Sequence, residues 1–290
     1  MDKSKITVIG SINMDLVTVA AEMPEQGETV RGESFETLPG GKGANQAVAA
    51  ARLGGDVRLI GKVGDDPFGA TLKAGLVSQG VYTQAITVAP GVSSGLANII
   101  VSDSDNRIII IGGANEELDT LYVDKFRRLI GESKYVLLQF EVPKATIEHV
   151  LTVCETLGVP VIINPAPAMQ LEDKYWEKAA YITPNDHEAK ALFAYDGYDL
   201  PKFHEKLIIT NGSGGATFFK KGERINVPAH RAEVKDTTGA GDTFNGALAV
   251  ALSEEQSLEE AVAFANRAAS LSIQKLGAQS GMPNREAMNQ

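Results

Sequence analysis

The chain has 290 residues, enough for one large domain with a sizeable core, and its 43% hydrophobic and 22% charged residues exclude a disordered or fibrous protein. Its formal net charge of −10 disfavours binding to nucleic acid or to a membrane surface, because both attract positively charged proteins. A single cysteine, Cys154, excludes an internal disulfide and a cysteine-based zinc site.

The N-terminus leads straight into an apolar run at residues 6–9, which predicts a strand. It lacks the hydrophobic segment of a signal peptide, and no later segment approaches the roughly 18 apolar residues that cross a membrane. We therefore expect a cytoplasmic protein with no membrane partner.

Strand-like runs then alternate with helical patterns along the chain. Apolar runs typical of strands buried on both faces are residues 6–9, 57–60, 135–140, 159–163, 181–183 and 207–210. Helical patterns cover 44–53, 68–78, 145–157 and 243–252, and Ser257 with Glu260 opens a further helix expected to stop near Gly277. This alternation predicts an α/β fold, a mostly parallel sheet covered by helices on both faces.

Two regions carry strand patterns without helices between them. Residues 15–19 and 29–37 alternate like strands, and 94–101 with 107–112 form a hairpin pattern. We expect a small antiparallel β-lid, built from about 13–38 and 94–112, on a single domain spanning 1–290. Such a layer acts as a lid over a site, as a dimerisation surface, or as both. A third hairpin, 216–220 with 224–227, is expected at the far edge of the main sheet.

The segment 236–248, Asp-Thr-Thr-Gly-Ala-Gly-Asp-Thr-Phe-Asn-Gly-Ala-Leu, carries the strongest chemical signal. Gly239 and Gly241 precede a helical pattern and leave its first N–H groups open, which is typical of an anion site. A carboxylate at that place, Asp242, suits a base that takes a proton from a hydroxyl while the hydroxyl attacks a phosphoryl group. The alternative is that Asp242 only caps the helix.

Residues 39–46, Pro-Gly-Gly-Lys-Gly-Ala-Asn-Gln, enter another helix. They are not a Walker A loop, because Gly43 follows Lys42 where Ser or Thr is required. Lys42 and Asn45 suit a polyhydroxylated ligand or a phosphate, and the alternative is a tightly packed helix entry made of small residues. No Gly-x-Gly-x-x-Gly run follows the first strand, which disfavours a dinucleotide-dependent oxidoreductase.

Asn13 and Asp15 follow the first strand in the run Gly-Ser-Ile-Asn-Met-Asp at 10–15. Ligands of α/β proteins bind just beyond the carboxyl ends of parallel strands. Because the two residues alternate to one side of an extended chain, both are able to contact the same hydroxyls. A turn with an Asx hydrogen bond is the alternative.

Together with further runs, these segments resemble the ribokinase-like (PfkB-type) carbohydrate kinases, and within that family the ribokinases. The resemblance extends over nearly the whole chain, through residues 10–15, 24–30, 40–50, 63–69, 113–115, 164–168, 183–189, 236–248 and 277–279. The run 236–248 marks the family as a whole, whereas 40–50, 164–168 and 277–279 look like ribokinases in particular.

The resemblance implies a kinase that makes D-ribose 5-phosphate from D-ribose and ATP. It makes Asp242 the catalytic base and the backbone of Gly239, Ala240 and Gly241 the anion hole. The implied sugar contacts are Asn13, Asp15, Gly41, Lys42, Gly43, Asn45, Glu141 and Asp242.

For the nucleotide and its ions, the resemblance implies further residues. Asn185 and Glu188 would organise Mg²⁺ and phosphate through water. ATP would contact Thr210, Asn211, Gly212, Ser213, Gly214, Gly215 and Gly241, with Asn266 on the adenine side. A potassium ion beside the anion hole would be held by Asp236, Thr238, Ser272, Lys275, Gly277 and either Ser280 or Gly281, several of them through carbonyls. The stretch 196–206 is too short for the full crossover helix of ribokinases.

We expect a homodimer, because the β-lid would leave strand edges and an apolar face exposed in a monomer and ribokinases pair such lids. Two other interpretations stay open. One is another sugar or nucleoside kinase of the family, and the other is a non-catalytic protein that senses a sugar or nucleotide on the same fold. Turnover of ATP with ribose separates the kinase from the sensor.

Overall fold

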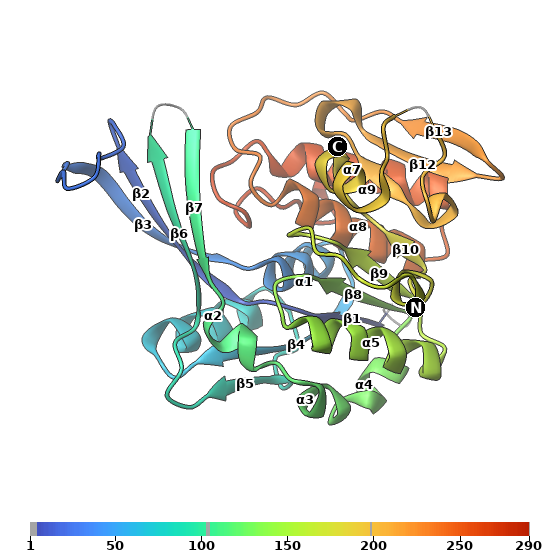
Figure 1. The fold of residues 1–290 in the computed structure, drawn as a ribbon, viewed down its shortest axis with the longest axis horizontal. Helices are drawn as coiled ribbons and strands as arrows, with labels where there is room; N and C mark the ends of the chain where they lie inside the picture. The colour runs from blue at the N-terminus through green and yellow to red at the C-terminus, as the bar shows by residue number, and fades with distance from the viewer. Residues whose placement is uncertain (1–4, 103–104, 198, 290) are drawn as a thin grey trace.

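The computed structural model describes residues 5–102, 105–197 and 199–289. Its centre is a six-stranded sheet whose neighbouring strands all run parallel. The strand order is β10 (Tyr181–Ile182), β9 (Val161–Asn164), β8 (Tyr135–Gln139), β1 (Lys5–Ile9), β4 (Asp56–Gly64) and β5 (Ile86–Ala89). The predicted parallel sheet is therefore confirmed (Figure 1).

Helices cover both faces of this sheet (Figure 1). One core cluster joins a face of the sheet to α1 (Lys42–Arg52), α2 (Pro67–Ser78), α8 (Ala240–Ser253) and α9 (Leu258–Ser272). The other joins the opposite face to α3 (Thr120–Asp124), α4 (Arg127–Gly131), α5 (Lys144–Leu157), α6 (Asp173–Trp176) and α7 (Asp186–Phe193). The neighbours Val8 and Ile9 belong to different clusters, which is why the strands read as unbroken apolar runs.

The last long helix, α9, ends earlier than its sequence predicts. Ser257 and Glu260 form the expected capping box at its start. The prediction of an end near Gly277 is wrong, because the helix stops at Ser272 and the carbonyl of Ile273 accepts the N–H groups of Lys235 and Asp236 instead. In the ranges that the structure describes, no helix is both long and apolar enough to span a membrane.

A second sheet projects from the first (Figure 1). We call it the β-lid; its order is β3 (Gly32–Gly40), β2 (Asn13–Ala20), β6 (Gly95–Ser102) and β7 (Asp105–Ile111). The two outer pairs are antiparallel as expected, but β2 and β6 run parallel. The reason is connectivity, since β2 follows β1 and β6 follows β5, two parallel strands that end at the same edge of the main sheet.

A third sheet extends the fold beyond β10. It contains β11 (Ile208–Thr210), β12 (Ala216–Lys220) and β13 (Glu223–Val227), so the predicted hairpin at 216–227 is confirmed. Run 207–210 pairs antiparallel with this hairpin and with no strand of the main sheet in the part of the chain that the structure describes. Isolated bridges join Leu207 to Ile182 of β10 and Thr210 to Asn185, the N-cap of α7. Between α7 and β11, the residues described hold one short turn of 3₁₀ helix at His204–Lys206 and no crossover helix.

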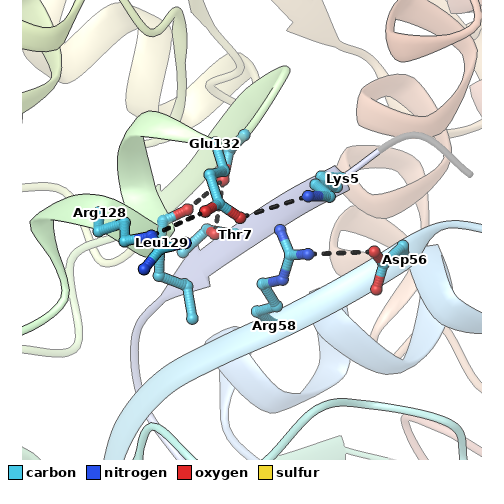
Figure 2. Close-up of polar contacts among 8 residues, drawn as sticks. Lys5, Thr7, Asp56, Arg58, Arg128, Leu129 and Glu132 are labelled. Carbon is cyan, nitrogen blue, oxygen red and sulfur yellow. Dashed lines mark hydrogen bonds and ion pairs between the residues drawn. The ribbon is translucent and has the colours of Figure 1, made fainter.

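The amino ends of the central strands carry a polar network of their own. Figure 2 shows Lys5 of β1 paired with Glu132 and Arg58 of β4 paired with Asp56. Thr7 is fully buried and shares a 2.7 Å hydrogen bond with the hydroxyl of Ser133. This edge lies opposite the carboxyl ends of the strands, where the chemically informative segments begin.

Candidate active site

The candidate site lies where β1 and β8 end and where α1 and α8 begin. Ala44 donates its N–H to the carbonyl of Ser11 across 2.9 Å, which brings the start of α1 against the end of β1. A β-carbon on Gly43 would lie 2.6 Å from the carbonyl carbon of Gly10, so this approach requires glycine. The tight helix entry is therefore confirmed, and it brings Lys42 and Asn45 to this edge; their role toward a ligand stays a prediction.

The expected sugar contacts come together at this edge. Glu141, just beyond β8, accepts hydrogen bonds from the Ser11 hydroxyl at 2.6 Å and from the Lys42 backbone N–H at 3.1 Å. The Asn13 side-chain oxygen accepts from Asn115 Nδ2 at 2.7 Å. Buried or half-buried positions are taken by Asn13, Asp15, Gly41, Lys42, Gly43, Asn45, Glu141 and Asp242.

Charges in this cluster perturb one another. Burial raises the pKa of Asp15 to about 7, helped by the negative charges of Glu141 and Asp242 and opposed by Lys42. Burial disfavours the charged form of Lys42, yet the carboxylates of Asp242 and Glu141 raise the pKa of this lysine above its usual value. Lys42 therefore remains a cation among carboxylates, which suits a site that binds hydroxyls and a phosphoryl group.

Asp242 does not cap its helix. The N-cap of α8 is Gly239, in the left-handed region at φ 77°, and among the residues described no side chain caps this helix. The Asp242 carboxylate points elsewhere, accepting from Asn45 Nδ2 at 3.0 Å on Oδ2 and from Gln46 Nε2 at 3.1 Å on Oδ1. The capping interpretation is therefore wrong, and a buried carboxylate stands beside an open helix N-terminus formed by Gly239, Ala240 and Gly241.

Asn185 and Glu188 form a capping box at the start of α7. Glu188 donates its backbone N–H to Asn185 Oδ1 at 2.8 Å, and Asn185 returns its N–H to Glu188 Oε2 at 2.9 Å. Burial raises the pKa of Glu188, and the Asn185 hydrogen bond and nearby Lys42 oppose that rise. The bridge from Asn185 to Thr210 brings this element next to the glycine-rich loop.

The loop from Thr210 to Gly215 packs against the end of β13. Residues Gly212–Gly214 form a 3₁₀ turn, and Thr210, Asn211, Gly212, Ser213 and Gly214 are at least partly exposed. A β-carbon on Gly215, at φ 89°, would lie 2.1 Å from the Val227 carbonyl oxygen. Asn266 donates to the same carbonyl at 2.8 Å, so it lies beside the loop with its amide bound to the backbone.

The two segments of the expected potassium site also lie side by side. Asp236 accepts from the Thr238 N–H at 2.9 Å and from the Gly277 N–H at 2.8 Å. Burial opposes ionisation of this carboxyl, but these hydrogen bonds hold its pKa below the ordinary value. A β-carbon on Gly281 would lie 1.8 Å from the carbonyl oxygen of Ser272. Lys275 is exposed, as is Ser280.

Several polar residues of the site received no role from the sequence. Gln46, Asn115, Asn164 and Gln279 lie within runs that marked the family, but a run does not say which side chains meet. The only indication of a role for Gln139 in the sequence is its position, as the one amide at the end of a mostly apolar strand. Their contacts join residues about a hundred positions apart, which local patterns do not report.

The chain is similar to known carbohydrate kinases over nearly its whole length. Residues 3–285 match the pfkB family carbohydrate kinases. The chain is 44% identical to a ribokinase of Bacillus subtilis, with 98% of each chain covered, and 45% identical to one of Lactococcus lactis, covering 97% of this chain and 94% of that one. A solved Arabidopsis thaliana ribokinase, complexed with ribose and ATP, superposes with a TM-score of 0.91 at 31% identity over 99% of this chain and 98% of that one. The chain belongs to the pfkB family of carbohydrate kinases.

Proposed function

We propose that this chain phosphorylates D-ribose at its 5-hydroxyl with ATP, giving D-ribose 5-phosphate and ADP. One observation carries the proposal: the buried Asp242 carboxylate lies both at the open N-terminus of α8 and in hydrogen-bond contact with Asn45 of the sugar cluster. A proton acceptor and an anion site thus meet where a sugar hydroxyl would attack. Relatives named as ribokinases support ribose as the sugar.

In this reaction Asp242 takes the proton of the 5-hydroxyl. The hydroxyl oxygen forms a bond to the γ-phosphorus, the bond from that phosphorus to the β,γ-bridging oxygen breaks, and ADP leaves with the electron pair. Asn13, Asp15, Asn45 and Glu141 would hold the remaining hydroxyls, so that the 5-hydroxyl faces Asp242.

The backbone N–H groups at 239–241 would stabilise the negative charge on the transferring phosphoryl group. Their direction comes from Gly239, whose left-handed backbone turns the chain into α8 and whose missing side chain leaves room for Ala278. Lys42, charged and close to Asp242 and Glu188, adds a positive group between the sugar and the phosphates.

A magnesium ion would supply charge neutralisation for the ATP phosphates. Within the residues described, no three His, Cys, Asp or Glu side chains gather to hold a metal. Kinase Mg²⁺ ions keep waters and phosphate ligands and need few protein groups, so Asn185 and Glu188 suit a water-mediated role.

A potassium ion would add positive charge beside the anion hole. The chain's residues suit it, because the Ser272 carbonyl fills the space where Gly281 lacks a side chain and Asp236 ties both segments together. Oxygen donors are the ligands such an ion takes. Of the two candidates for the last ligand, we favour Gly281, which lies against the Ser272 carbonyl. The Ser280 hydroxyl instead donates to the Leu276 carbonyl.

The β-lid would close over the sugar and exclude water, which otherwise competes as phosphoryl acceptor. We place a homodimer contact on the same sheet, since β7 exposes all of Ile108, Ile109, Ile110 and Ile111. As ATP is the donor, the cytoplasm is the compartment in which we place the reaction.

An ADP-release assay across a substrate panel tests the proposal. The panel holds D-ribose, 2-deoxy-D-ribose, D-fructose and inosine, with direct titration of each compound by calorimetry. We expect the highest kcat/KM with D-ribose. A higher value with another compound supports the alternative of a different sugar or nucleoside kinase, and ribose binding without ADP release supports a sensor.

A further inference from the structure

Two chains of side-chain amides end on the two oxygens of Asp242. In the outer arm, Gln279 Nε2 donates to Asn45 Oδ1 at 2.9 Å and Asn45 Nδ2 donates to Asp242 Oδ2 at 3.0 Å. In the inner arm, Gln139 Nε2 donates to Gln46 Oε1 at 2.6 Å and Gln46 Nε2 donates to Asp242 Oδ1 at 3.1 Å. Every hydrogen bond in both arms therefore runs toward the same carboxylate.

The carboxylate itself dictates this direction. An ionised Asp242 only accepts hydrogen bonds, so Asn45 and Gln46 must turn their NH₂ groups toward it. Their carbonyl oxygens then point away and need donors, which Gln279 and Gln139 provide. Donors aligned head to tail polarise one another, so the second amide of each arm strengthens the hold of the first on Asp242.

The inner arm contains a buried group that destabilises the fold. Gln139 is fully buried, and among the residues described its Oε1 has no hydrogen-bond partner. That oxygen lies against Gly10, where a β-carbon would approach it to 2.0 Å. A buried acceptor without a partner is unfavourable, and such groups in native structures call for an explanation. Holding Gln46 in its required direction explains this one.

We propose that Gln139 and Gln279 are positioning residues, which act through Gln46 and Asn45 to hold the Asp242 carboxylate in the orientation that accepts the sugar proton. The proposal rests on the role of Asp242 in the proposed function. Neither glutamine touches the reacting atoms. The inner arm reaches Asp242 through Gln46, whose amide also donates to Asn164 Oδ1 at 3.2 Å, whereas the outer arm passes through Asn45, an expected sugar contact.

The test compares Gln139→Met with Thr7→Val. The first keeps side-chain volume but removes the inner donor; the second removes another buried hydrogen bond, at the opposite end of the sheet (Figure 2). We expect Gln139→Met to lower kcat by roughly 10- to 100-fold, the scale of a misplaced catalytic group. Its ribose Kd should stay within about threefold of wild type, because the lost interaction acts in the transition state. Thr7→Val should lower the denaturation midpoint about as much as Gln139→Met does and should keep the wild-type kcat.

Gln279→Met keeps the proposal testable if Gln139→Met does not fold, because Gln279 is half-buried on a loop. We expect it to lower kcat and to raise the ribose Kd severalfold, since the side-chain amide of Asn45 loses its donor and is free to rotate. Wild-type kcat in both glutamine variants overturns the proposal, and so does an equal loss in Thr7→Val. If Asp242→Asn also keeps wild-type kcat, the proposed function fails as well; if Asp242→Asn alone is inactive, only this proposal fails.

Discussion

Asp15 lies directly against Gly40: a β-carbon on Gly40 would be 2.3 Å from each of the two Asp15 carboxylate oxygens. Asp15 belongs to β2 and Gly40 ends β3, so the pair stands at the base of the β-lid. Any larger residue at position 40 would displace the carboxylate from this place. The contact explains how an acidic side chain comes to be 9% exposed, with its pKa raised by burial to about 7.

This burial predicts a dependence of stability on pH. The folded pKa of Asp15 is about 7 against an ordinary 3.8, so the folded state binds a proton more tightly than the unfolded state. The contribution of this group to stability is complete below a pH of about 3.8, falls as the pH rises from there to about 7, and is lost above that window. We expect Asp15→Asn to raise the Tm of the ligand-free protein most at pH 8 and less at pH 5, because at pH 5 the unfolded wild-type carboxyl is already ionised but the folded one is not. An equal shift at both values would contradict the assignment.

Asp15 also provides a test of the sugar site. A charged hydrogen bond lost from a closed pocket costs about 1.5–3 kcal/mol, or at least about tenfold in affinity. Asp15→Ala is expected to weaken ribose binding by that amount and to leave ATP binding nearly unchanged. Isothermal titration of each ligand measures both. An unchanged ribose affinity would remove Asp15 from the sugar contacts.

The base has its own test. Asp242→Asn keeps the shape of the side chain but removes the proton acceptor, and we expect kcat to fall by roughly 10² to 10⁴, the usual range for a positioned base. Ribose binding should stay close to wild type, and the variant should remain folded with a somewhat lower denaturation midpoint, because the amide of either Asn45 or Gln46 loses its acceptor. Steady-state ADP release at saturating ribose and ATP provides kcat, and a variant with wild-type kcat would rule out Asp242 as the base.

The sequence predicts those parts of the molecule that depend on neighbouring residues. Strand runs are continuous because residues such as Val8 and Ile9 face different helical layers, and that signal is local. The site segments were found for the same reason, since each joins a strand end or a helix start to polar residues a few positions away.

The remainder depends on contacts between distant segments. The end of α9 is set by Lys235 and Asp236, which bind the Ile273 carbonyl from outside the helix. The parallel pairing of β2 with β6 follows from the order of strands in another sheet. No pattern within β8 indicates that Gln139 meets Gln46, 93 positions away.

The β-lid predicts a homodimer. All four isoleucines of β7, residues 108–111, are 48–60% exposed, and Phe35 on β3 is 61% exposed. A monomer would leave this apolar surface in water. We expect light scattering at micromolar concentration to give the mass of a dimer, and Ile109→Lys to shift it toward the monomer. Leu121→Lys, at a 72% exposed position on α3, is the matched control and should stay dimeric. A monomeric wild-type protein would contradict the prediction.

Potassium should act on the chemical step. Asp236 joins the segment before the anion hole to Gly277, so a cation held by these segments would orient the N–H groups of residues 239–241. That effect belongs to the transition state, and we expect several-fold higher kcat in K⁺ than in Na⁺ at matched ionic strength, with little change in ribose Kd. Widely spaced carbonyl oxygens hold the smaller sodium ion less well, which provides the selectivity.

Two variants distinguish an effect of the bound ion from an effect of the loop conformation. Asp236→Ala removes both hydrogen bonds and should abolish the difference between K⁺ and Na⁺. Gly281→Ala brings a methyl group against the Ser272 carbonyl, 1.8 Å from the ideal β-carbon, and should weaken K⁺ activation while leaving ribose binding intact. Titrations of kcat against each salt, with choline chloride as the inert control, measure the effect. Equal rates in K⁺ and Na⁺ across the full titration would mean that Asp236 only fixes the turn before α8.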